Sequence, residues 1–132
     1  METNEQYEMR SLREAQAHEA EINRAPLSDR KEAQESFAEA LRDPALVAER
    51  IGWLIDGNYG YGEMLMAKRV VRNKRTNREA ALTQMVAIFE WQCPARMAVD
   101  AWKKLSASEK RTLDDAVKIV IGEAEKEMKE QG

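Results

Sequence analysis

The sequence predicts an all-α protein, a compact bundle of six to seven helices with short connections. Apolar residues recur at helical spacing along most of the 132-residue chain, and no segment alternates apolar and polar residues between hairpin turns, as half-buried strands do. The composition, 43% apolar and 34% charged with three prolines, is typical of a folded helical protein rather than a disordered one. A chain of this length forms one domain and buries enough surface to fold without a disulfide or a metal.

The first expected helix, residues 3–24, has few apolar side chains. They are separated by charged positions and comprise Met9, Leu12, Ala15 and Ile22. Pro26 ends this helix because proline disfavours the helical conformation at the residue before it. We therefore expect residues 1–25 to form an N-terminal charged helical arm, either solvated or waiting for a partner, followed by a single helical domain over residues 26–132.

The next two helices are expected over residues 29–42 and 44–56. Ser28 is a favourable N-cap for the first of them. Asp43 and Pro44 start the second, because aspartate caps a helix and proline suits its first turn. The apolar stripe of this second helix follows the spacing i, i+4, i+7, i+8, at Val47, Ile51, Leu54 and Ile55.

The following helices are expected over residues 62–74 and 77–91. Thr76 and Glu79 have the spacing of a capping box, which would start the second of these. After its first turn this second helix is apolar around most of its circumference, at Leu82, Met85, Val86, Ile88, Phe89 and Trp91. Because a helix wetted on one side would not show this pattern, we expect residues 77–91 to be the central helix or half of a dimer interface.

The last two helices are expected over residues 94–105 and 107–130. The first directs its apolar residues to one side, at Ala98, Ala101, Trp102 and Leu105. Ser106 and Glu109 repeat the capping-box spacing and would start the second. If two copies associate, we expect the contact to form through the apolar helices 77–91 and 94–105.

The charge of the chain is unevenly distributed. Residues 1–50 carry seven basic and twelve acidic side chains, whereas residues 51–78 carry six basic and two acidic ones. The basic side chains of this second segment are Lys68, Arg69, Arg72, Lys74, Arg75 and Arg78. On a helix, Lys68, Arg72 and Arg75 would share one face. That face suits a phosphate backbone, a protein partner, or the Glu-rich first two helices.

The stretch DGNYGYG, residues 56–62, is interpreted as a bend in which Gly57 or Gly60 ends a helix. It lacks the preceding strand of a dinucleotide fingerprint and the Gly-Lys-Ser/Thr of a P-loop. A weaker alternative is an anion held by the amides that start the next helix. Tyr59 and Tyr61 are expected to pack over neighbouring helices, and an exposed pair would suit a protein interface.

Catalytic chemistry finds little support. His18 is the only histidine, and Cys93 is the only cysteine and lies between two apolar helices, where cysteine is usually a small buried hydrophobe. We therefore expect no enzyme activity, no catalytic residue, no metal and no cofactor. The unpaired cysteine and the absence of an apolar N-terminal run or membrane span favour a cytoplasmic setting without a membrane partner.

The sequence thus favours a non-enzymatic protein-interaction module, an adapter, inhibitor or regulator, whose partner is another protein. The alternative is a nucleic-acid-binding protein that uses the basic segment 68–78 to contact phosphates.

Overall fold

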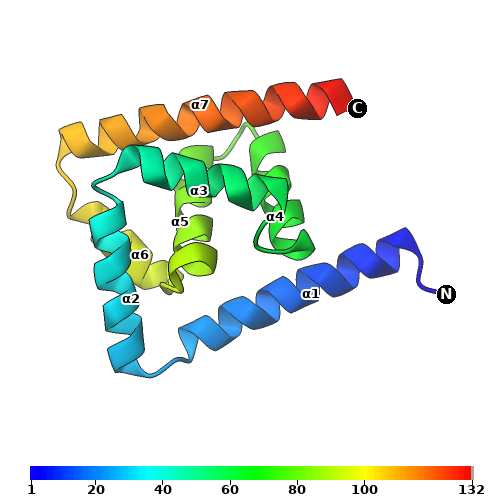
Figure 1. The fold of residues 1–132 in the computed structure, drawn as a ribbon, viewed down its shortest axis with the longest axis horizontal. Coiled ribbons are helices and arrows are strands. Elements are labelled where there is room, and N and C mark those ends of the chain that lie inside the picture. The colour runs from blue at the N-terminus through cyan, green and yellow to red at the C-terminus, as the bar shows by residue number, and fades with distance from the viewer. Residues whose placement is uncertain (132) are drawn as a thin grey trace.

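The computed structural model describes residues 1–131, in which the chain forms seven helices and no strand (Figure 1). The helices are α1 (Asn4–Asn23), α2 (Leu27–Ala40), α3 (Pro44–Asp56), α4 (Tyr61–Arg72), α5 (Arg78–Trp91), α6 (Ala95–Lys103) and α7 (Ala107–Gln131). The all-α class and the compact bundle predicted from the sequence are confirmed, and each connection is three to five residues long. None of the helices in this described part of the chain combines the length and the apolar character needed to cross a membrane.

Helix α5 lies at the centre of the bundle, and α1 and α7 lie along opposite edges (Figure 1). All six other helices contact α5. Its side chains Leu82, Val86 and Phe89 are buried in the core, and no residue of α5 is fully exposed. The expectation that this helix is central is confirmed, so its apolar circumference is explained largely by its neighbours in the same chain.

Helix α7 packs along α3 through a continuous aliphatic stripe. Leu113, Val117 and Ile121 are buried at successive turns of α7, and they face a core to which α3 contributes Val47 and Ile51. Large side chains at i and i+4 spacing cover a helix flank efficiently, so burial of this stripe stabilises the α3/α7 contact.

Helix α1 packs along α4 by a different means, the close approach of two backbones. A Cβ atom built at Gly62 of α4 would lie 2.1 Å from the carbonyl oxygen of Ser11 and 3.1 Å from the Cβ of Ala15. Only glycine therefore fits at this position of α4 while α1 stays where it is. The charged arm expected from the sequence has its partner helix within the same chain. Its division from the rest of the chain as a separate unit stays a prediction.

Several helix ends follow the predicted chemistry. The side chain of Asp43 accepts the N–H of Leu46 at 3.3 Å, and Gly57 ends α3 with a φ of 93°. The capping box before α7 is complete: the hydroxyl of Ser106 accepts the N–H of Glu109 at 3.1 Å, and the Glu109 carboxylate accepts the N–H of Ser106 at 2.9 Å.

Two predicted caps are wrong. Helix α2 begins at Leu27, directly after Pro26, so Ser28 lies inside its first turn and caps nothing. Before α5 the cap is Asn77, whose side-chain oxygen accepts the N–H of Ala80 at 3.1 Å. Thr76 does not fill that role because its hydroxyl donates a hydrogen bond to the carbonyl of Asn73. An asparagine one position later supplies the better-placed acceptor.

Candidate functional site

The candidate site begins with the outer side of α5. At about 100° per residue, Gln84 points away from the buried Leu82. Ala80, Ala81 and Gln84 are half-buried rather than covered. From Ala80 to Phe89 the helix carries no charged side chain. The outer side of α5 therefore projects little from the helix, because two of its side chains are alanines. It also carries no charge.

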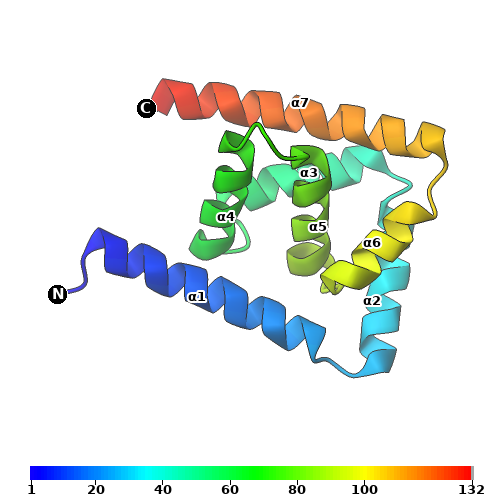
Figure 2. The ribbon, with the colours of Figure 1, turned by 180° about the vertical axis from the view of Figure 1, so that it is seen from behind.

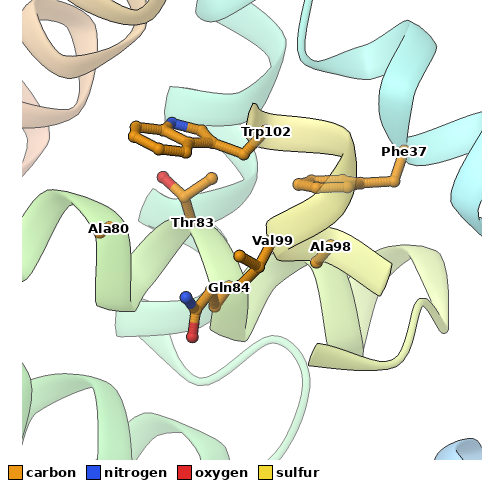
Figure 3. Close-up of a pocket in the computed structure, with 7 residues that line it drawn as sticks. All are labelled: Phe37, Ala80, Thr83, Gln84, Ala98, Val99 and Trp102. Carbon is orange, nitrogen blue, oxygen red and sulfur yellow. The ribbon is translucent and has the colours of Figure 1, made fainter. Parts of the chain in front are cut away.

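A small pocket of about 100 Å³ lies on one flank of this outer side, between α5 and α6 (Figure 3). We call it the α5/α6 pocket, and it is lined by Phe37, Ala80, Thr83, Gln84, Ala98, Val99 and Trp102. The Trp102 indole lies over Thr83 (Figure 3), whose hydroxyl donates to the carbonyl of Glu79 at 2.7 Å. With that hydroxyl satisfied, the pocket presents mostly apolar atoms to an incoming side chain.

A longer groove of about 370 Å³ lies on the other flank, between α4 and α5. We call it the α4/α5 groove, and it is lined by Glu19, Met66, Arg69, Val70, Ala81, Gln84, Met85, Ile88, Phe89 and Ala95. Met66 and Met85 are unbranched and adaptable, which suits a surface that fits itself to a partner. Only Glu19 and Arg69 bring charge to this lining.

The pocket and the groove meet at Gln84, which lines both of them. Together they form one surface across α5, which we call the α5 face. Figure 2 shows α4, α5 and α6 side by side, with the C-terminal half of α1 running below them. The α5 face thus has two mostly apolar hollows on either side of an uncharged residue, Gln84.

The predicted basic residues separate into two groups. Lys74 and Arg78 face α7, where they pair with Glu125 at 3.5 and 3.3 Å. Burial opposes ionisation of Glu125, but the two cations outweigh it and hold the pKa of its carboxyl below the ordinary value. Arg78 also donates to the carbonyl of Val71 at 2.8 Å. These two basic side chains hold the α4–α5 connection against α7.

The other four basic residues are not in such pairs. Lys68 is half-buried and lines a hollow of about 150 Å³ together with Asp56 and Glu127. Arg69, Arg72 and Arg75 are exposed and make no ion pair within residues 1–131. These three arginines are the exposed part of the predicted basic segment that makes no ion pair among the described residues.

The expected helical face of Lys68, Arg72 and Arg75 is wrong, because α4 ends at Arg72 rather than at residue 74. Asn73 causes this early end. Its side-chain oxygen accepts the N–H of Arg75 at 3.2 Å, which builds a local turn in place of a further helical turn. Arg75 therefore lies in the connection to α5.

The two tyrosines pack against other parts of the chain, as expected. The Tyr61 ring lies 5.0 Å from the ring of Tyr7 in α1, measured between centroids. Tyr59 is half-buried beside Arg50 and Glu90, and burial, reinforced by the Glu90 carboxylate, raises the pKa of its hydroxyl. Both rings are thus engaged within the fold rather than forming a shared exposed pair.

A polar cluster between α3 and α5 escaped the sequence reasoning. Arg50 donates to the Glu90 carboxylate at 2.8 Å, and its guanidinium lies 4.0 Å from the centroid of Trp53. Both charged side chains of the ion pair are about three-quarters buried. The two partners lie 40 residues apart in the sequence, so no local pattern connects them. The cluster joins two core helices, and among the described residues the Arg50 Nε and the neighbouring Tyr59 hydroxyl are buried without a hydrogen-bond partner.

The single cysteine and the single histidine both pack against other parts of the fold. Cys93 is fully buried, and burial raises the pKa of its thiol to about 11, so the thiol stays protonated near neutral pH. The His18 ring packs 5.9 Å from the ring of Phe89. Among residues 1–131, no three His, Cys, Asp or Glu side chains gather in a way that could hold a metal ion.

The fold and the α5 face define a small all-α bundle whose central helix is half-buried along its outer side. No protein-family model matches the chain, and neither the curated proteins nor the solved structures include a significant match to it.

Proposed function

We propose that this protein is a non-enzymatic interaction module, an adapter, inhibitor or regulator, that holds a partner protein on the α5 face. The observation that carries the proposal is the meeting of the α5/α6 pocket and the α4/α5 groove at Gln84. A cytoplasmic setting is part of the proposal and is supported by the single, unpaired Cys93.

The hollows suit side-chain anchors from a protein. Burying one large apolar side chain contributes about 1.5–3 kcal/mol, so two anchors contribute enough to offset part of the entropy lost on association. Interfaces usually draw most of their affinity from a few such anchors near their centre. The neutral Gln84 ridge lies between the two hollows, where desolvating a charge would weaken binding.

Site-directed photo-crosslinking in the cell that makes the protein tests the proposal. The crosslinking amino acid p-benzoylphenylalanine replaces Gln84 in one sample and Ile119 in the other. Ile119 is a suitable control because it is 65% exposed on α7, outside the α5 face. We expect one or a few proteins to be captured from position 84 and not from position 119. Identical adducts from both positions would contradict the proposal.

A binding titration with purified proteins then distinguishes a specific partner from a protein that was crosslinked by random encounter. The captured protein is purified and titrated against the wild type, Gln84→Trp and Ile119→Trp. The introduced indole fills the junction of the hollows without changing charge, so Gln84→Trp should weaken binding at least about tenfold, the loss of one anchor's burial. Ile119→Trp should bind as the wild type does. An affinity of Gln84→Trp within twofold of the wild type would overturn the proposal.

Nucleic-acid binding is the second candidate, and the three unpaired arginines Arg69, Arg72 and Arg75 favour it. Anisotropy of labelled duplex DNA and single-stranded RNA, titrated at two salt concentrations, tests it. Three phosphate contacts would give a slope of log K against log salt of about −2.7 on duplex DNA. The slope should disappear in the Arg69→Ala/Arg72→Ala/Arg75→Ala variant. Absence of binding at low salt would remove this candidate.

A further inference from the structure

We infer that the partner segment held on the α5 face is an amphipathic helix with acidic flanks. This inference rests on the proposed function and adds the conformation and the charge of the partner.

The backbone of the α5 face favours a helical partner over an extended one. The face is built mainly from α4, α5 and α6, with Glu19 of α1 and Phe37 of α2 also in its lining, and the backbone groups of these helices are used in helical hydrogen bonds. An extended peptide would find no strand edge to pair with and would bury its own N–H and C=O groups without partners. A helix satisfies its own backbone and presents apolar side chains at i, i+3, i+4 and i+7, which suits two hollows separated by a ridge.

One edge of the face is basic. Arg69 lines the α4/α5 groove, Arg72 follows one turn later on α4, and Arg75 lies in the connection beyond it. All three are exposed, and none is in an ion pair in the part of the chain that the structure describes. Because Lys74 and Arg78 are already paired with Glu125, the charge at this edge comes from the three free arginines.

The opposite edge, on α6, is basic as well. Arg96 and Lys103 stand at i−3 and i+4 from Val99, one of the three α6 residues that line the α5/α6 pocket. Helical geometry therefore puts both beside Val99, and both are exposed without an ion pair among the described residues. The exposed Asp100 stands at i+4 from Arg96 and i−3 from Lys103, so it lies beside both cations and leaves these three residues with a net charge of +1. Glu19 is the one acidic residue in the lining of either hollow.

Two basic edges around an apolar centre complement a helix with an apolar stripe and carboxylates on its flanks. Each exposed ion pair changes an affinity by only about 1.5- to 5-fold. The hollows would therefore set most of the affinity, and the five cations would select the charge of the partner and speed its approach.

Selection from a displayed helix library tests this inference on the full chain. Each library member is an 18-residue helix with a varied apolar stripe, and each flank position encodes Glu or Lys with equal frequency. After selection on the wild-type protein, we expect Glu to exceed Lys about tenfold at the flank positions. Equal frequencies or an excess of Lys would overturn the inference.

A charge-reversed protein sharpens the result. Selection on Arg69→Glu/Arg72→Glu/Arg75→Glu should shift the enriched flanks toward Lys. The matched control is Arg111→Glu/Lys118→Glu/Lys126→Glu, which changes the net charge equally at exposed, unpaired positions of α7. The control should still select Glu. If both variants shift alike, the preference comes from net charge and the inference fails.

The test separates failure of the inference from failure of the proposed function. Selected helices without a charge preference that lose binding to Gln84→Trp would overturn the acidic partner and keep the α5 face as the site. Helices that bind Gln84→Trp as well as the wild type, or a selection that enriches none, would overturn both. A wild-type protein that sediments as a dimer while Gln84→Trp is monomeric would assign the face to a second copy and overturn the acidic helix.

Discussion

The two sides of α5 differ although the sequence makes both apolar. The inner side places Leu82 and Val86 in the core with no exposed surface. The outer side carries Ala80, Ala81 and Gln84 between two hollows. An all-round apolar helix can therefore have two different sides. One side of α5 stabilises the fold, and the other is the side that we propose binds a partner.

The largest expected effect is on the inner side. Leu82→Ala removes a fully buried side chain and leaves a cavity, so it should lower the free energy of unfolding by about 2–5 kcal/mol. Gln84→Ala, two residues away on the outer side, should change it by less than about 0.5 kcal/mol. Urea unfolding of the three proteins measures both values. Equal losses would show that the outer side is also core.

The contact between α1 and α4 should be nearly as sensitive. Gly62→Ala puts a methyl group against the carbonyl oxygen of Ser11, so α1 must shift, at a cost of about 1–3 kcal/mol. Gly122→Ala is the matched control, because a Cβ there meets nothing within 4 Å. That change should stabilise α7 by up to about 1 kcal/mol. Thermal unfolding measures the change in stability of both variants. Hydrogen exchange of the α1 amides shows whether the loss in Gly62→Ala comes from the α1/α4 contact.

Cys93, buried in the connection between α5 and α6, should be inert in the folded protein. Its pKa is raised from 9.0 to about 11 by burial, so a thiol reagent at pH 8 should react far more slowly with native than with urea-unfolded protein. The native state binds this proton more tightly, so its contribution to stability is present below pH 9 and is lost as pH rises toward 11. Equal reaction rates in the two states would contradict the burial.

The smallest effect is expected at the α4–α5 connection. Glu125→Gln removes the carboxylate that pairs with Lys74 and Arg78. Because solvent screens ion pairs at partly exposed side chains, we expect Glu125→Gln to lower the stability less than Gly62→Ala does. Because the folded pKa of Glu125 is lowered, the difference from the wild type should be present above the ordinary value of 4.5 and shrink as pH falls through the lowered pKa. Urea unfolding at several pH values measures it.

Local patterns predicted much of the fold. The Asp43 cap, the Ser106 and Glu109 capping box, and the end of α3 at Gly57 depend on residues within a few positions of each other. The apolar circumference of α5 predicted either a central helix or half of a dimer interface, and the structure shows the central position. Such features can be predicted because their physical causes lie within one helix or its first turn.

The candidate site depends on contacts that the sequence does not show. The hollows exist because α4 and α6 flank α5 at a spacing set by the whole bundle. All six basic residues of the predicted segment are close in the sequence, yet Glu125, about 50 positions away, pairs with two of them. Arg75 lies outside the helix in which it was expected, because Asn73 forms a local turn with it. Competing polar contacts of this kind decide which charges stay free.

The most direct test of the account measures stability and binding together in Gln84→Trp. The ligand is a helix selected on the wild-type protein. We predict that its affinity falls at least about tenfold while the free energy of unfolding changes by less than about 0.5 kcal/mol, with neither quantity altered by Ile119→Trp. An unchanged affinity, or an affinity lost only together with a loss of stability as large as that of Leu82→Ala, would contradict the division of α5 into a core side and a binding side.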